Sequence, residues 1–438
     1  MATPTSGSKA ILLILLIAIL QMEEGSEPTL NQFRSLAMAD AADDQEWTTV
    51  EKNNTHFVAS GKPFHVSGFN TYWLMSFSVD HSARAKVSDV LRQSASIGLN
   101  VCRTWAFSDG GANPLQISPS VYDEDVFKAL DFVVYEARRH RMRLILSFCN
   151  NWEDYGGKAQ YVKWGKEAGL DLSSDDDFFS DPTVKGYYRA HVEAILTRVN
   201  TFNGIMYKDD PTIFAWELIN EPRCPSDPSG DTLQSWIEEM ASYVKSIDPS
   251  HLLEIGTEGF YGSSTPEYLH LNPGTYFAQV GTDFIRNHQA AGVDFASVHI
   301  YSDSWLANSV TGEHLVFLKS WMEEHMDAAE KVLNMPVVFG EFGVTSKDEK
   351  FTAKFREVFI NTVYNTLWKS RMRGGSGGGC LLWQLFPEGT EHMDDGYAVV
   401  LHKCSITSKL LPDHNRRLFP SDWEERSEVE SYIFHEEL

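Results

Sequence analysis

Residues 213–222 read Ile-Phe-Ala-Trp-Glu-Leu-Ile-Asn-Glu-Pro, and residues 336–343, Pro-Val-Val-Phe-Gly-Glu-Phe-Gly, have the same character further along the chain. Each is a short apolar run that delivers a carboxylate, Glu221 in the first and Glu341 in the second. Short runs of this composition, bounded by Pro or Gly, predict fully buried strands of a parallel sheet. Two glutamates at the ends of two such strands are expected to face each other.

Six further runs of the same kind complete a set of eight predicted strands, separated by segments with apolar residues at helical spacing. The predicted strands cover residues 64–70, 100–105, 143–149, 213–220, 252–256, 295–301, 337–341 and 380–383. The predicted helices cover residues 85–97, 123–139, 187–200, 232–247, 314–333, 350–369 and 405–410. This alternation predicts an α/β fold, a (β/α)8 TIM barrel that forms a single catalytic domain over residues 47–419.

In such a barrel the functional residues gather at the carboxyl ends of the strands. A glutamate after a strand is usually a solvated turn residue. The residues next to Glu221 and Glu341, however, favour a place in a functional site. Pro222 restricts the backbone of Glu221, and Gly340 leaves room for another group to approach Glu341. A facing pair of carboxyl groups is the arrangement that cleaves a glycosidic bond, one protonating the departing oxygen and the other attacking or activating water.

Three polar residues inside the predicted strands are candidates for the same site. An arginine in a strand is costly unless it is paired, so we expect Arg103 to pair with Glu341 and keep it ionised; the alternative is a structural ion pair elsewhere in the barrel. A lone histidine is usually a satisfied core residue. However, His299 and Tyr301 share one face of their strand by the period of two, and both are expected beside the two glutamates.

Tryptophans follow four of the predicted strands: Trp73, Trp105, Trp152 and Trp383. A single tryptophan at a strand end belongs more often to the core than to a sugar-binding surface. Four that converge on one rim favour the second interpretation, because the apolar faces of sugars stack on aromatic rings. The sequence therefore predicts a cleft for an oligosaccharide.

The net charge of -24 and the pI near 5.0 argue against nucleic acid and against stable membrane association, since both reward basic patches. A neutral polysaccharide suits an acidic protein better, and we expect the chain to act as a monomer. Part of the negative charge lies in an acidic C-terminal tail, residues 420–438, which is expected to be solvated.

The first 25 residues are predicted to be a signal peptide, because one apolar run, residues 10–20, is too short for an ordinary membrane span. An uncleaved anchor is the alternative. Residues 26–46 form an N-terminal extension, and Asn53 begins an Asn-Asn-Thr glycosylation sequon that secretion would make usable. We therefore expect a secreted glycoprotein of the extracellular space or cell wall.

The chain has five cysteines, so at least one cannot pair within it. Cys102, Cys149 and Cys380 lie inside predicted strands, where a buried thiol acting as a small hydrophobe is expected. A disulfide among the five stays open. No Cys-His spacing is typical of a zinc site, and no metal or other cofactor is expected.

At these residues the chain resembles glycoside hydrolase family 5 of clan A, and within it the plant-type endo-β-1,4-mannanases. The stretches most particular to that subgroup are residues 150–152, 155–157, 160–165 and 258–262, which read Asn-Asn-Trp, Tyr-Gly-Gly, Gln-Tyr-Val-Lys-Trp-Gly and Glu-Gly-Phe-Tyr-Gly. Many family members place a histidine where this chain has Asn150 and Asn151. The resemblance implies these roles: Glu221 as acid/base, Glu341 as nucleophile, Asn220 at the 2-hydroxyl of the cleaved sugar, Tyr301 and Arg103 at the nucleophile, His299 near the acid/base, and Trp105, Trp383 and Trp152 on the substrate.

The predicted function is endo-acting, retaining hydrolysis of β-1,4-mannosidic linkages in mannan, glucomannan and galactomannan. For this division of roles Glu221 is expected to have a raised pKa and Glu341 a lower one. The alternatives on the same scaffold are a cellulase-like β-1,4-glycanase and a mannan transglycosylase. A remote alternative is a noncatalytic barrel that binds sugar.

Overall fold

The structure is a computed structural model that describes residues 47–348 and 351–418. The predicted signal peptide (residues 1–25), the extension (26–46) and the acidic tail (420–438) lie outside the described residues. The compact unit from Thr49 onward carries the fold and the site. Among the described helices, none combines the length and hydropathy that crossing a membrane requires.

Eight parallel strands form the central sheet, in the spatial order β10-β9-β8-β5-β4-β13-β12-β11. In chain order they are β4 (Val66–Asn70), β5 (Val101–Trp105), β8 (Arg143–Ser147), β9 (Ile213–Glu217), β10 (Leu252–Glu254), β11 (Ala296–Ile300), β12 (Val337–Phe342) and β13 (Gly377–Leu382). The two ends of this order are joined, because the backbone N–H of Asp294 donates to the Leu253 carbonyl (2.8 Å) and that of His299 to the Glu258 carbonyl (3.2 Å). The sheet therefore closes into the predicted barrel.

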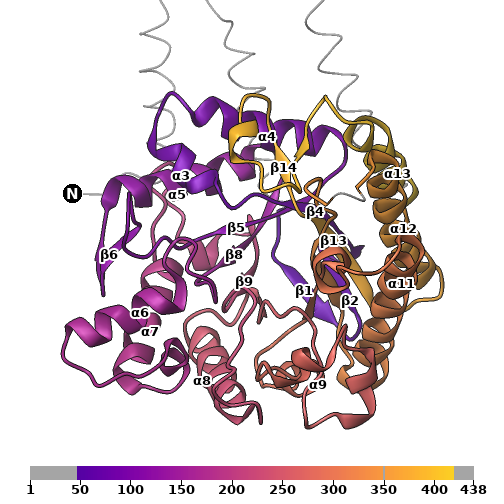
Figure 1. The fold of residues 1–438 in the computed structure, drawn as a ribbon. Helices are drawn as coiled ribbons and strands as arrows, with labels where there is room; N and C mark the ends of the chain where they lie inside the picture. The colour runs from indigo at the N-terminus through magenta and orange to yellow at the C-terminus, as the bar shows by residue number, and fades with distance from the viewer. Residues whose placement is uncertain (1–46, 349–350, 419–438) are drawn as a thin grey trace, which may run out of the picture. The chain divides into compact units, whose positions relative to one another are not determined.

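Helices surround the barrel, with α11, α12 and α13 on one side and α6 and α7 on the other (Figure 1). The helices between consecutive strands and after the last one are α4 (Arg84–Ser96), α5 (Glu124–Arg139), α7 (Pro182–Leu196), α8 (Asp231–Ile247), α9 (Phe284–His288), α11 (Thr311–Ala328), α12 (Ala353–Met372) and α13 (Leu411–Leu418). All residues of the barrel strands are buried, as expected where helices cover a parallel sheet.

Local capping explains where several of these helices begin. The Asp123 side chain accepts from the backbone N–H groups of residues 125 and 126 at the start of α5, and Asp181 does the same for residues 183 and 184 at the start of α7. Pro182 occupies the first turn of α7, where the missing N–H costs nothing. This cap begins α7 at Pro182 rather than at the predicted residue 187.

An antiparallel sheet of β1 (Val50–Asn53), β2 (His56–Ala59) and β3 (Lys62–Phe64) covers the amino ends of the barrel strands. Phe57 of β2 packs edge-on against Phe214 (5.2 Å between ring centroids) and Phe295 (5.3 Å), near the beginnings of β9 and β11. The barrel is thereby closed at the end opposite to the carboxyl ends of its strands.

Short elements fill the loops on both sides of the barrel. Most were not predicted, but those at residues 329–333 and 406–410 lie within the predicted helices 314–333 and 405–410. The short elements are α3 (Leu74–Val79), β6 (Gln116–Ser118), β7 (Val121–Tyr122), α6 (Gly157–Glu167), η1 (Asp175–Phe179), η2 (Tyr207–Asp209), η3 (Pro266–Leu271), η4 (Thr275–Gln279), α10 (Ser302–Trp305), η5 (Ala329–Leu333), β14 (Leu385–Phe386), η6 (Glu391–Met393), β15 (Val399–Val400) and η7 (Ile406–Leu410).

The last barrel strand begins earlier than predicted, because residues 377–379 of the glycine run belong to it. A Cβ at Gly379, which has φ +150°, would lie 2.0 Å from the Val66 carbonyl oxygen of the neighbouring strand. Only glycine permits this close pairing of β13 with β4.

Candidate active site

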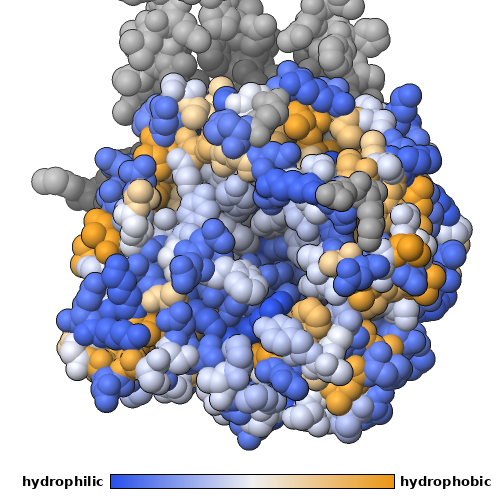
Figure 2. Space-filling view, in the orientation of Figure 1, coloured by the Kyte–Doolittle hydropathy of each residue, from blue (hydrophilic) through white to orange (hydrophobic). Residues whose placement is uncertain are grey.

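The carboxyl ends of the barrel strands surround a cleft of about 780 Å³. It corresponds to the hollow in the middle of the face shown in Figure 2. The lining includes seven of the predicted site residues: Trp105, Trp152, Asn220, Glu221, Tyr301, Glu341 and Trp383. The other two, Arg103 and His299, are buried among them with exposed fractions of 1% and 0%.

The two predicted glutamates meet across this cleft. Glu341 lies within β12, and Glu221 follows β9 by four residues. Glu221 has φ +51°, a left-handed conformation that is uncommon outside glycine. Its backbone N–H donates to the Gly256 carbonyl (2.8 Å), which fixes the turn from which the side chain projects. A carboxylate oxygen of Glu221 and one of Glu341 lie within 4.8 Å of each other.

Arg103 uses all five of its N–H groups in this site. Two donate to the carboxylate of Glu217 (2.5 and 2.8 Å), one to Oε1 of Glu341 (2.6 Å), and one each to the side-chain carbonyls of Asn70 (3.0 Å) and Asn220 (2.7 Å). The predicted pairing of Arg103 with Glu341 is therefore confirmed. Glu217 holds the far side of the guanidinium, so the direction of the N–H groups toward Glu341 is fixed.

The other oxygen of Glu341 accepts a hydrogen bond from the Tyr301 hydroxyl (2.5 Å). Burial raises the pKa of Glu341, and the positive charges of His299 and Arg103 reduce this rise without cancelling it. Donors on both oxygens hold the carboxylate in one orientation at the lining of the cleft.

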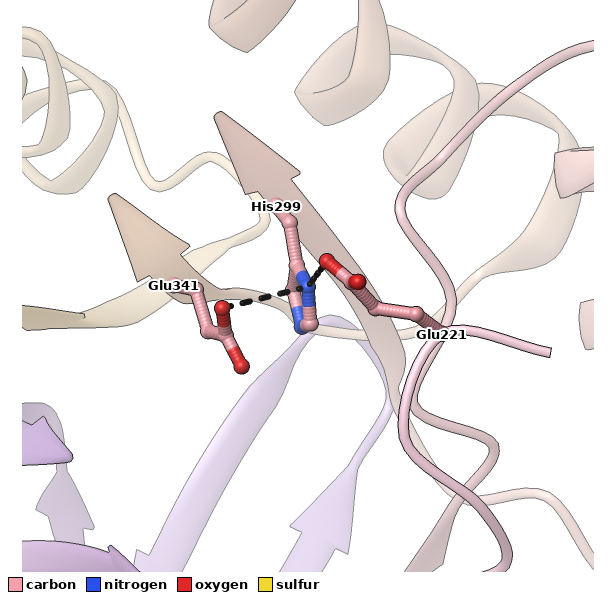
Figure 3. A group of neighbouring side chains, drawn as sticks. All are labelled: Glu221, His299 and Glu341. Atoms are coloured by element: carbon pink, nitrogen blue, oxygen red, sulfur yellow. Dashed lines mark hydrogen bonds and ion pairs between the residues drawn. The ribbon is translucent and has the colours of Figure 1, made fainter. Parts of the chain in front are cut away.

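His299 lies between the two carboxylates, as Figure 3 shows. Its Nδ1 is 2.7 Å from Oε1 of Glu221 and 3.7 Å from Oε2 of Glu341. The ring can approach because residue 340 is glycine, where a Cβ would lie 3.3 Å from the His299 Nε2. The other oxygen of Glu221, Oε2, accepts a hydrogen bond from the indole Nε1 of Trp152 (2.7 Å).

These contacts reverse the predicted order of the two pKa values. Burial alone would raise the pKa of Glu221, but the hydrogen bond and charge of His299, together with Trp152 and Arg223, lower it below its usual value. Burial likewise works against His299, yet the charge of Glu341 and the hydrogen bond to Glu221 raise its pKa. Both directions favour the imidazole as the carrier of the proton of the His299–Glu221 pair.

Asn220 lies between Arg103 and Asn150. Its carbonyl accepts from Arg103, and its Nδ2 donates to Oδ1 of Asn150 (3.0 Å). An amide nitrogen carries two hydrogens, so one of them stays available to a ligand in the cleft. Asn150 thus orients Asn220.

Three neighbouring aromatic rings form a wall of the cleft. The ring of Trp383 lies 6.1 Å from that of Tyr72 and 6.4 Å from that of Trp105, measured between centroids. Asp395 fixes the Trp383 indole by accepting its N–H (2.8 Å). The structure therefore places Trp105 and Trp383 at the cleft, as predicted.

Trp73 does not belong to this wall, so the prediction of four converging tryptophans is wrong at that position. Its side chain is fully buried and stacks on Phe386 (5.9 Å between centroids). Tyr72, one residue earlier, lines the cleft instead. The chain turns into α3 directly after Trp73, and this turn exchanges which of the two neighbours faces the core.

Several cleft residues were missed by the sequence analysis. Arg223 and Glu258 form a bidentate pair (2.7 and 2.6 Å), and the Arg223 guanidinium lies 5.1 Å from the Trp152 ring centroid. Burial and the charge of Glu221 raise the pKa of Glu258 to about 7. The other missed members of the lining come from loops without a strand signal: Tyr72, Asp154, Tyr155, Tyr276, Phe277, Ser304, Trp305, Asp395 and Tyr397. The available signals were the position of Arg223, two residues after Glu221, and the stretches 155–157 and 258–262, which contain Tyr155 and Glu258.

Glu221, His299 and Glu341 also form the one group in the described residues whose atoms are spaced to ligate a metal ion. Arg103 already donates to Glu341, and Arg223 contributes positive charge near Glu221. A cation here would compete with two guanidinium groups, so the donor set fits proton transfer better than metal binding.

The cysteines predicted in strands are buried thiols without a disulfide. This holds for Cys102, Cys149 and Cys380, as predicted. Cys224, for which no such prediction was made, is also a buried free thiol. Burial raises the pKa of each of the four thiols, so they are unreactive.

A closed (β/α)8 barrel with two carboxylates facing each other across a cleft defines the class of the glycoside hydrolases. Residues 46–392 match the family described as "GH family 5 beta-mannosidase-like". The chain belongs to this family.

Comparison with individual proteins gives the same result. The chain is 66% identical over 369 residues to mannan endo-1,4-beta-mannosidase 8 of Oryza sativa subsp. japonica, which covers 84% of this chain and 99% of that protein. It is 48% identical over 360 residues to mannan endo-1,4-beta-mannosidase 1 of Solanum lycopersicum, covering 82% and 89%. Among solved structures, the endo-1,4-beta-mannanase of Rhizomucor miehei superposes with a TM-score of 0.70 at 27% identity, over 84% of this chain and 98% of that one.

Proposed function

We propose that this protein is a secreted, endo-acting, retaining hydrolase of β-1,4-mannosidic linkages in mannan, glucomannan and galactomannan. The observation that carries the proposal is the pair Glu221 and Glu341, whose oxygens lie within 4.8 Å of each other in the cleft. Retaining enzymes place their carboxyl groups about 5–5.5 Å apart, whereas inverting enzymes need about 6.5–9.5 Å to admit a water molecule.

In the first step the carboxylate of Glu341 attacks the anomeric carbon, while the bond from that carbon to the leaving oxygen breaks. Arg103 and Tyr301 hold the two oxygens of Glu341, so the attack requires little reorientation. The leaving oxygen takes a proton from Glu221. The product is a glycosyl ester on Glu341 and a free hydroxyl on the departing part of the polymer.

The proton for this step is supplied through the pair of His299 and Glu221. The negative charge of Glu341 supports the positive charge on His299. When Glu341 forms the ester, that charge is lost and the imidazolium becomes more acidic. A proton then passes over 2.7 Å from Nδ1 to Glu221 as the leaving group accepts one. The coupling makes acid catalysis available when the nucleophile attacks.

In the second step water attacks the anomeric carbon and the ester bond to Glu341 breaks. The proton of the water returns to Glu221 and His299, and the free carboxylate of Glu341 is restored. Two inversions at the same carbon leave its configuration unchanged. No other group is needed to balance the reaction.

The choice of a mannan substrate is supported by the relatives of this chain, of which two rice proteins named mannan endo-1,4-beta-mannosidase are 66% and 65% identical to it. The cleft supports internal cleavage, because two groups of aromatic rings line it. Trp383 lies beside Tyr72 and Trp105, and a second group of Trp152, Phe277 and Trp305 gathers near Arg223.

Secretion and glycosylation form the second part of the proposal. Asn53 lies at the end of β1, and its side chain is exposed. The hairpin of β1 and β2 covers the amino ends of the barrel strands, so a glycan there would lie at the end of the barrel opposite the cleft. Its attachment would leave the proposed active site open.

The test is incubation of the secreted protein with mannan, glucomannan, galactomannan, cellulose and xylan, with product lengths and solution viscosity followed over time. We expect short manno-oligosaccharides and a fall in viscosity before reducing ends accumulate. Steady release of monomer, or faster turnover of cellulose than of mannan, would overturn the proposal. Longer products than the starting oligosaccharide would identify the transglycosylase alternative.

A further inference from the structure

A second hollow lies beside the catalytic cleft, over the outer face of α11. Its volume is about 610 Å³, comparable with the 780 Å³ of the cleft. The end of η3 and the following residues 272–273 form one wall, and α11 forms the other with residues between Gly312 and Glu324. We call this hollow the α11 groove. It has no part in the proposed mechanism.

The cleft and the α11 groove share a wall. Trp305 lines the cleft, and the next residue, Leu306, lines the groove. The Trp305 ring packs edge-on against Phe317 (6.2 Å between centroids) and Trp321 (5.8 Å), which both line the groove. On the opposite wall, Tyr276 lines the cleft and Pro273, three residues earlier, lines the groove. The two hollows are therefore adjacent along both walls.

An exposed aromatic ring stands where they adjoin. Tyr276 is 57% exposed although its neighbour Phe277 packs against Phe260 (4.5 Å between ring centroids). In the groove, Val316 is 71% exposed. An exposed ring beside a substrate cleft, followed by exposed apolar surface, is where the apolar face of a further sugar would bind.

The remaining lining also suits a neutral sugar. Asn272 and Ser320 offer amide and hydroxyl groups, and Glu313 and Glu324 offer carboxylates that accept hydrogen bonds from sugar hydroxyls. These carboxylates, on a chain of net charge -24, disfavour an acidic partner and a second copy of the chain. A mixture of single polar groups with apolar surface is typical of sites for uncharged polar ligands.

We propose that the α11 groove is a distal binding site for the substrate polysaccharide, reached from the cleft across Tyr276 and Trp305. The occupant is the same β-1,4-linked hexose chain that is cleaved, on the side of the cleft that carries Arg223 and Glu258. The proposal rests on the proposed function for the identity of the sugar. Its consequence is a preference for long chains, because only they reach the groove while a bond lies between Glu221 and Glu341.

The test compares kcat/KM for manno-oligosaccharides of four, six and eight sugars in variants of the exposed helix face. Ser320→Trp fills the groove, and Val316→Asp removes its apolar surface. Lys319→Trp is the control for Ser320→Trp, because it places an indole one position away, outside the groove lining. Val332→Asp is the control for Val316→Asp, because it makes the same substitution at a 47% exposed valine of η5, also outside the lining. All four positions are outside the catalytic machinery.

We expect the ratio of kcat/KM for eight sugars to that for four to fall about fivefold in Ser320→Trp and Val316→Asp, with the four-sugar value unchanged. The two control variants should keep the wild-type ratio. The proposal is overturned if this eight-to-four ratio of kcat/KM is equal in Ser320→Trp and Lys319→Trp. It is also overturned if Ser320→Trp changes the oligomeric state of the protein while the ratio keeps its wild-type value. If the wild-type enzyme cleaves cello- or xylo-oligosaccharides instead, the mannan assignment fails, and the same length series in the cleaved sugar still tests the groove.

Discussion

Nδ1 of His299 lies 2.7 Å from Oε1 of Glu221, and this contact decides where the catalytic proton is held. The same nitrogen is 3.7 Å from Oε2 of Glu341, so both carboxylates act on one ring. Their negative charge raises the pKa of His299, and the imidazole lowers that of Glu221. The site is best described as three groups that share protons, because a change in any one alters the pKa values of the other two.

The pH profile of kcat/KM should narrow from both sides in His299→Asn. The alkaline limb in the wild type reports loss of the proton from the His299–Glu221 pair, whose imidazole has a raised pKa. Without the imidazole, Glu221 alone holds that proton, and the limb moves to lower pH by about one unit or more. In the wild type the positive charge of His299 lowers the pKa of Glu341. The variant lacks this charge, so the pKa of Glu341 rises and the acid limb moves to higher pH.

The measurement is kcat/KM on a manno-oligosaccharide from about pH 3 to 9. His325→Asn is the matched control, because His325 is a buried histidine that contacts backbone carbonyls and neither catalytic carboxylate. A profile in His299→Asn that is merely lower, with both limbs in place, would contradict the shared proton.

Glu341→Ala should lower kcat by about a thousandfold or more while the protein stays folded. Folding survives because Arg103 keeps both hydrogen bonds to Glu217 after Glu341 is removed, so no buried cation is left unpaired. Azide should restore turnover by attacking the anomeric carbon in place of the carboxylate, which yields a glycosyl azide of inverted configuration. Circular dichroism checks the fold and NMR the product, and absence of any azide adduct would argue against Glu341 as nucleophile.

The barrel was predictable from the sequence because each strand is a buried run with a defined end. The eight predicted strands all exist, and their observed boundaries lie within three residues of the predicted ones. Arg103, His299, Tyr301 and both glutamates were found for the same reason: they stand in or directly after the predicted strands, where the period of two and the shared carboxyl edge indicate their direction.

Loop residues and pKa values were not predictable in this way. Tyr276 and Asp395 reach the cleft from loops whose path depends on tertiary packing. Trp73 was misplaced because a helix begins immediately after it. The order of the two carboxyl pKa values depends on hydrogen bonds of 2.7 Å to Glu221 from His299 and Trp152, and sequence spacing carries no information on such contacts.

Glu254→Gln should reduce the loss of thermal stability between pH 5 and pH 8. Burial and the charge of Glu217, its partner on the adjacent strand, raise the pKa of Glu254 to about 8, and Arg103 opposes this rise. In the unfolded chain the pKa is about 4.3. The folded state therefore binds the extra proton, and this contribution to stability is lost as the pH rises from about 4.3 through 8.

Because glutamine does not titrate, the fall in Tm over this range should be about 2–4 °C smaller in Glu254→Gln than in the wild type. Differential scanning calorimetry at both pH values gives the comparison. Glu267→Gln, at an exposed glutamate of η3, is the control and should follow the wild type. An identical pH dependence in Glu254→Gln and wild type would show that Glu254 is ionised in the barrel.

Trp152→Phe should lower kcat about tenfold and leave KM within about twofold, since it removes the 2.7 Å hydrogen bond to Oε2 of Glu221 and keeps a ring beside Arg223. Trp152→Ala should lower kcat similarly and also raise KM, because the ring is lost. From sequence alone Trp152 ranks below Trp383, as a residue of a longer rim loop. Its direct contact with Glu221 removes the reason for that ranking.

Trp383→Phe is the matched comparison, because its indole N–H donates to Asp395 and not to a carboxylate of the catalytic pair. That variant should change KM more than kcat. Steady-state kinetics on one manno-oligosaccharide separates the two parameters when chemistry is slow. If Trp152→Phe keeps the wild-type kcat while Trp383→Phe loses it, the indole of Trp152 only lines the cleft and does not orient Glu221.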